Sequence, residues 1–208
     1  MHQYNKDTEF AASNLIALAR DEAGQLLRLQ SDLRQIEAEV AHHYWDFSTS
    51  DMNDDFPEYQ SISAFRRMAE AHAKKQQQER RINSIQSSME SKKTAIEFIA
   101  GSILQLARQG ISIVHSNDPQ SPPGRMIGSV SLREVVWYGR NQAIHYEERP
   151  KSPVVALFRT LEQEQGRHFS LSLNHGKSMA KHVITLLGWD SYEAYLSDME
   201  SLLESTNL

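Results

Sequence analysis

Apolar side chains recur at alternating steps of three and four residues in two long segments of the chain. They are Leu26, Leu29, Leu33, Ile36 and Val40 in the first segment, and Ile82, Ile85, Met89, Ile96, Ile99, Ile103 and Leu106 in the second. This spacing is typical of helices that pack side by side as in a coiled coil. We expect helices over about 8–46 and 58–115, and a joint near Asn83 is compatible with the second pattern. An acidic turn and Pro57 separate them, so they should form an antiparallel hairpin.

The remainder of the chain has the pattern of shorter helices. Residues 117–124 are rich in Pro and Ser, which is typical of a loop. The helices expected after this loop cover about 131–148, 153–166, 174–187 and 190–204. No segment shows the alternation of a strand, and no internal repeat is visible. The pattern predicts an all-α fold, an elongated helical bundle with a long antiparallel helix hairpin, in a single domain over residues 1–208.

Local signals mark several of these helix ends. Two stretches have the form of a capping box, Ser131-Leu132-Arg133-Glu134 and Asp190-Ser191-Tyr192-Glu193. Ser152 and Pro153 suit a cap and a first helical residue, while Gly166 and Gly188 suit helix ends.

Composition narrows the function classes. The chain has no Cys, which excludes disulfides and thiolate metal sites and favours a reducing compartment. Its nine His form no set with metal-ligand spacing, so we expect no metal and no other cofactor. No apolar run approaches the roughly 20 residues of a membrane span, and the N-terminus lacks the pattern of a signal peptide. We expect a cytoplasmic protein without a membrane partner.

The net charge of −5 is unevenly distributed. Residues 66–93 carry eight basic and three acidic side chains, a local net charge of +5. The doublets Lys74-Lys75 and Arg80-Arg81 are candidate RNA-binding residues, because such a stripe can follow a phosphate backbone. The alternative is a solvated face of a long helix, which is the usual role of a charge run.

The residues with the most distinctive chemistry are Arg140-Asn141-Gln142-Ala143-Ile144-His145. Asn141 and His145 are i,i+4 neighbours on the expected helix, so the amide can hold the imidazole ring. Arg140 and His145 lie roughly 140° apart around the helix axis, so a second surface should complete the site. An imidazole that transfers protons and a guanidinium that binds phosphate can cleave a phosphodiester without a metal.

This motif resembles the signature of the HEPN superfamily (higher eukaryotes and prokaryotes nucleotide-binding domains). There, four to six residues separate the Arg from the His, and a polar residue such as Asn commonly follows the Arg. The resemblance covers about residues 60–205. It implies a metal-independent endoribonuclease with Arg140, Asn141 and His145 in its catalytic site, active as a homodimer. It also implies a toxin or anti-phage effector that acts on RNA and is restrained by an antitoxin or a defence-system partner.

One departure and two alternatives accompany this interpretation. HEPN proteins paired with a nucleotidyltransferase antitoxin place a Tyr two residues after the His, whereas here Tyr146 follows directly and Glu147 takes that position. The first alternative is a non-catalytic HEPN-like module that binds a partner or a nucleotide. The second is a plain scaffold in which Arg140 and His145 pair with Glu147 and Glu148 or cap the helix. The aromatic side chains Trp137, Tyr138 and Tyr146 are expected in the core or at a dimer contact rather than against a base.

Overall fold

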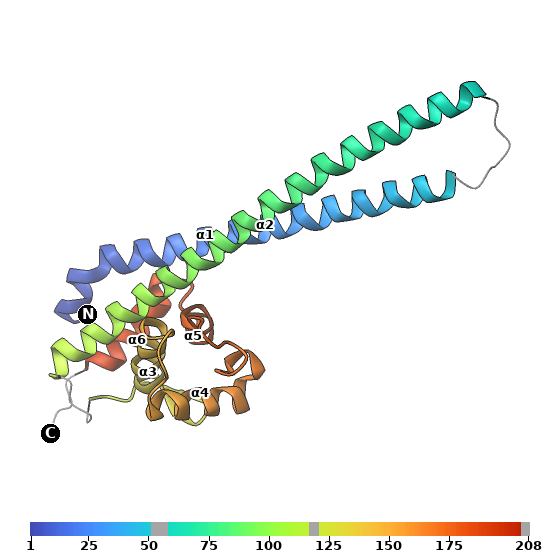
Figure 1. Ribbon diagram of the computed structural model, residues 1–208. Coiled ribbons are helices and arrows are strands. Elements are labelled where there is room, and N and C mark those ends of the chain that lie inside the picture. Colours follow the sequence, from blue (N-terminus) through green and yellow to red (C-terminus); the bar gives the residue numbers. More distant parts are fainter. Residues whose placement is uncertain (51–57, 117–120, 205–208) are drawn as a thin grey trace. The chain divides into compact units, whose positions relative to one another are not determined.

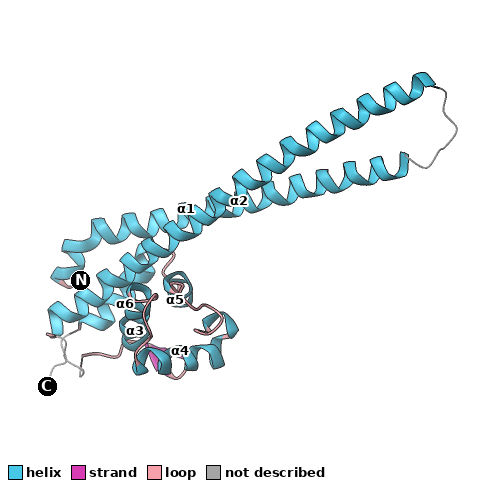
Figure 2. Cartoon of the chain, viewed as in Figure 1, coloured by secondary structure: helices cyan, strands magenta, loops and turns pink. Residues whose placement is uncertain are grey.

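The computed structural model describes residues 1–50, 58–116 and 121–204, with the side chains of 39–40, 42–50 and 58–75 excepted. Helices dominate these residues (Figure 2), which confirms the predicted all-α fold. In chain order the elements are α1 (Gln3–Ser50), α2 (Glu58–His115), β1 (Met126–Ile127), β2 (Val130–Ser131), α3 (Leu132–Ile144), α4 (Ser152–Gln165), a 3-10 turn (Arg167–Phe169), α5 (Ala180–Leu187) and α6 (Tyr192–Leu203).

Helices α1 and α2 run antiparallel, as predicted (Figure 1). The chain divides into two compact units, residues 1–22 with 94–208, and residues 23–93. Within the first unit the Tyr4 hydroxyl donates to the carbonyl oxygen of Leu106 at 2.8 Å. Within the second, Lys92 Nζ donates to Gln25 Oε1 at 2.6 Å. Helix α2 is continuous through Asn83, so the joint considered there is absent. The acidic turn between the helices falls largely on residues 51–57, outside the described residues.

Helix α3 lies at the centre of the unit formed by residues 1–22 and 94–208. Its buried residues recur at helical spacing along one broad face: Leu132, Val135, Val136, Gly139, Gln142 and Ala143. It packs against α4, α5 and α6, which contribute Phe158, Leu161, Val183 and Met199 to the same core. Burial of each such side chain stabilises the fold by about 1.5–3 kcal/mol, so this core fixes the orientation of α3.

A short β-hairpin immediately precedes α3. Strands β1 and β2 pair in an antiparallel ladder, which the sequence pattern did not predict because each strand has only two residues. Gly128 in the turn has a φ of 61°, and the Ser129 amide donates to Glu164 Oε2 of α4 at 3.1 Å. The hairpin thereby ties the start of α3 to α4.

The predicted helix starts hold to within two residues in three places. Ser131 caps α3 in a full capping box with Glu134, as expected. Helix α6 is capped by Ser191 rather than Asp190, since the Ser191 hydroxyl accepts from the Ala194 amide at 3.2 Å. Helix α4 begins at Ser152, so Lys151 is the cap residue.

Two predicted helices are shorter than expected. Helix α3 ends at Ile144, because His145 leaves the helical conformation with φ −112° and ψ 29°. Helix α5 begins at Ala180, because the Asn174 amide nitrogen instead holds a turn through the carbonyl oxygens of His168 and Ser170. Gly188 ends α5 in the left-handed conformation, as predicted.

Replacing Ser131 tests the capping box. Ser131→Ala should lower the free energy of unfolding by about 1 kcal/mol, because the Glu134 amide at the start of α3 loses its acceptor and the Glu134 carboxylate loses the bond from the Ser131 hydroxyl. Hydrogen bonds from the Ser131 side chain and backbone lower the pKa of Glu134, so its contribution is present at neutral pH and lost as the pH falls through that lowered pKa. Urea unfolding at neutral and acidic pH measures the change. Ser102→Ala, at an exposed position inside α2, is the control, and an equal effect of both variants would contradict the prediction.

Candidate active site on helix α3

Arg140 faces helix α2 and is half-buried there. Its Nε donates to Gln105 Oε1 at 2.6 Å, and its Nη1 donates to Asn141 Oδ1 at 3.2 Å. Burial lowers the pKa of Arg140, and the positive charge of Arg108 lowers it further. Among the described residues no carboxylate lies within 4 Å of this guanidinium, so its charge is held by neutral amides.

Helices α2 and α3 meet in an antiparallel register that places these groups side by side. A Cβ at Gly101 would lie 3.9 Å from that of Ala143. One turn further along α2, Gln105 contacts Arg140 of α3. After another turn of α2, the Arg108 guanidinium lies over the Trp137 ring of α3, 4.2 Å from the ring centroid. Arg140 and Arg108 therefore belong to one surface, formed by successive turns of both helices.

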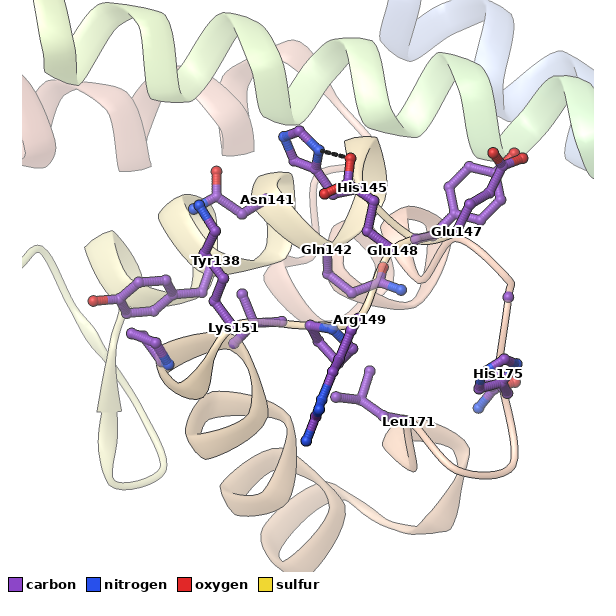
Figure 3. Close-up of a pocket in the computed structure, with 16 residues that line it drawn as sticks. Tyr138, Asn141, Gln142, His145, Glu147, Glu148, Arg149, Lys151, Leu171 and His175 are labelled. Carbon is purple, nitrogen blue, oxygen red and sulfur yellow. Dashed lines mark hydrogen bonds and ion pairs between the residues drawn. The ribbon is translucent and has the colours of Figure 1, made fainter.

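His145 takes a different environment, just past the end of α3. Its backbone amide caps the helix by donating to the Asn141 carbonyl at 3.1 Å. Its Nδ1 lies 2.8 Å from Glu148 Oε1, and both side chains are exposed, 51% and 67% respectively (Figure 3). The expectation that the Asn141 amide holds the His145 ring is therefore wrong. Because the helix stops at Ile144, the following turn brings Glu148 to the ring instead.

A pocket of about 480 Å³ opens beside His145. Asn141 and His145 line it from the end of α3, Arg149 and Lys151 from the next turn, and His175 from the segment before α5. Figure 3 shows His145 and His175 well apart across it. Arg140 does not line this pocket. Asn141 alone of the three motif residues belongs to both surfaces, since it lines the pocket and accepts a hydrogen bond from Arg140.

Gln142 stabilises this arrangement, although the sequence reasoning assigned it no role. It is only 6% exposed. Its Nε2 donates to the Lys177 carbonyl at 2.8 Å, and its Oε1 accepts from the Met179 amide at 2.8 Å. Gln142 therefore fixes the segment that carries His175 to α3. The available signal was its position one turn after Gly139, on a face that is otherwise apolar.

Two of the three aromatic residues expected in the core lie against it, and Tyr146 does not. Trp137 and Tyr138 are partly buried against the core, and Trp137 also supports Arg108. Tyr146 lines the pocket.

The proposed RNA-binding stripe stays a prediction. Arg80 and Arg81 are exposed on α2 within the unit of residues 23–93, whereas the side chains of Lys74 and Lys75 lie outside the described residues.

The described residues show neither a cluster of metal ligands nor a membrane-spanning helix. In the part of the chain that the structure describes, no three His, Asp or Glu side chains gather as a metal site would require. None of the described helices combines the length and apolar character of a bilayer crossing.

Comparison with protein-family models, with curated proteins and with solved structures gives no match for this chain.

Gln142 offers a direct test of how the site is held. Gln142→Met keeps the length of the side chain but leaves the Lys177 carbonyl and the Met179 amide without partners. Each buried unsatisfied group costs about 1–3 kcal/mol, so the free energy of unfolding should fall by at least about 1 kcal/mol. Denaturant unfolding measures this change. Gln165→Met, at the exposed end of α4, should be nearly neutral, and a neutral Gln142→Met would show that these two hydrogen bonds contribute little.

Proposed function

We propose that this chain is a HEPN-like, metal-independent endoribonuclease that cuts RNA by attack of the 2′-OH, as a toxin or anti-phage effector. The observation that best supports the proposal is the state of Arg140. Its guanidinium is half-buried, is held by the amides of Gln105 and Asn141, and has no carboxylate partner among the described residues. A preorganised, uncompensated cation of this kind is suited to the charge that develops on a phosphorane.

The contact between His145 and Glu148 is also suited to catalysis. A carboxylate beside Nδ1 favours the tautomer that has its proton on that nitrogen, which leaves the lone pair on Nε2. Nε2 can then take the proton from the 2′-OH as that oxygen attacks phosphorus. The P–O5′ bond breaks, and the 5′ oxygen takes a proton, to give a 2′,3′-cyclic phosphate and a 5′-OH end. Glu148 is a positioning residue in this scheme.

The second candidate function is a non-catalytic nucleotide-binding or interaction module. The pocket beside His145 favours it, because Arg149 and Lys151 place positive charge at its edge and Leu171 and Val154 give it an apolar wall. A module of this kind would bind a nucleotide without cutting RNA. Cleavage assays distinguish the two functions.

Cleavage of labelled RNA in EDTA is the decisive measurement. Wild type should cut RNA with chelator present and leave a cyclic phosphate. His145→Ala should lower the rate by about 10²–10⁴-fold and Arg140→Ala by about 10²–10³-fold, because each removes a proton-transfer or charge-stabilising group.

His175→Ala and Arg159→Ala are the matched controls. His175 lines the same pocket outside the motif, and Arg159 is exposed on α4, so both variants should retain most of the activity. Cleavage that EDTA abolishes and Mg²⁺ or Mn²⁺ restores would exclude the mechanism, and no cleavage by well-folded wild type would favour the nucleotide-binding module.

The proposed enzyme is a homodimer with α3 near the two-fold axis. A single motif supplies one imidazole, and the reaction needs both a base and an acid, so two copies complete the chemistry. Ile144, next to His145, is 46% exposed and gives an apolar contact for such an interface. Light scattering should show a dimer at micromolar concentration, and Ile144→Glu should convert it to monomer. Leu173→Glu, at another exposed apolar position, should leave the dimer intact. A stable wild-type monomer would refute this prediction.

A further inference from the structure

Arg108 and Arg140 bring two positive charges together on the surface shared by α2 and α3. Arg108 is close enough to contribute to the lowered pKa of Arg140, after the larger effect of burial. Like charges that share a partly desolvated surface repel, and the repulsion destabilises the folded chain unless an anion offsets it. Among the described residues, neither guanidinium has a carboxylate within 4 Å that could be this anion.

Neutral groups hold both guanidinium groups in place. The Trp137 ring covers one face of Arg108 at 4.2 Å, and Arg108 Nε is buried without a hydrogen-bond partner. A ring stacked on the face leaves the terminal N–H groups at the edge of the guanidinium available for an acceptor. Arg140 uses Nε and Nη1 for Gln105 and Asn141, and has N–H groups remaining on Nη2.

Arg125 has a structural role, and its hydrogen-bond partners differ from those of Arg108 and Arg140. Its Nε and Nη2 donate to the two carboxylate oxygens of Asp198 at 2.7 and 2.9 Å, and Nη2 also donates to the Leu187 carbonyl at 2.7 Å. The hydrogen bonds to Asp198 and its negative charge raise the pKa of Arg125. Arg108 and Arg140 have the opposite arrangement. Neutral side chains hold them in place, and neither has a carboxylate partner among the described residues.

We propose that Arg108 and Arg140 together bind one phosphate group, so that Arg108 is a second phosphate-binding residue beside the motif. The proposal deepens the proposed function and rests on it for one point, that the phosphate belongs to RNA. Two guanidinium forks present planar pairs of donors to a phosphate, a geometry that a lysine does not reproduce. Asn141, which contacts Arg140 and also lines the pocket, would connect this phosphate with the nucleotide beside His145.

Binding of an RNA that cannot react tests the proposal separately from cleavage. A fluorescein-labelled 2′-O-methyl RNA lacks the attacking hydroxyl, and its affinity is measured by anisotropy with the full chain. Arg108→Gln should weaken binding about tenfold or more, as expected for loss of a charge-assisted phosphate contact, and should reduce the salt dependence by about one counterion. Arg108→Lys should also weaken binding, but less. Arg159→Gln should match wild type.

Inorganic phosphate in competition identifies the source of the phosphate. It should displace the RNA from wild type, and displacement from Arg108→Gln should need a higher phosphate concentration. The contrary outcome is that wild type binds inorganic phosphate through Arg108 and binds no RNA. In that outcome the site takes free phosphate or a nucleotide, and the inference that the bound phosphate belongs to RNA is refuted. Absence of cleavage with Arg108-dependent RNA binding refutes the nuclease alone.

RNA and phosphate affinities in Arg108→Gln equal to those of wild type would overturn the phosphate site. Circular dichroism establishes that the variant is folded. If Arg108→Gln does not fold, Arg108→Lys decides, because it keeps the charge and loses the fork. Wild-type affinity for both ligands in Arg108→Lys would then overturn the proposal.

Discussion

The close packing of α3 on two sides is the constraint on which the site depends. A Cβ at Gly139 would lie 3.1 Å from Cγ1 of Val183, so a side chain at this position would require Val183 of α5 to shift, and glycine allows the close approach without that shift. On its other side α3 meets α2, where Ala143 faces Gly101. These contacts set the rotation of α3 about its axis. Arg140, the residue after Gly139, is thereby turned toward α2, where it donates a hydrogen bond to Gln105 and lies near Arg108.

The elements of the fold were largely predictable because their signals are local. Leu26 and Ile36 in one seam and Ile96 and Ile103 in the other are buried, as the helical spacing indicated. The capping box at Ser131 also lies within four consecutive residues. The last residue of α3 and the first residue of α5 were less predictable, because hydrogen bonds made by side chains in the adjacent turns compete with the helix. Asn174 illustrates this competition, since its amide bonds to carbonyl groups that precede it.

The candidate site was predictable only in part. The angular separation of Arg140 and His145 follows from helix geometry, and the structure indeed places Arg140 against α2 and His145 at the pocket. The partners of Arg140 could not be predicted, because Gln105 and Arg108 precede it by more than thirty residues and only the packing of α2 on α3 brings them close. In the scaffold interpretation of the sequence, Glu148 is a partner of His145 with a structural role. Its contact with Nδ1 is equally compatible with a role in orienting a catalytic ring.

The overall acidity of the chain is compatible with an RNA substrate when charge is considered locally. Asp198 is an example of local compensation, since its carboxylate pairs with Arg125. The positive charges of Arg108 and Arg140 are not compensated by carboxylates in the described residues, and partial burial reduces the screening that water and salt provide. A phosphate group at this surface would therefore meet a local field of opposite sign to the net charge of −5. Local placement of charge, rather than the net charge, determines which anions a helical surface such as this one can bind.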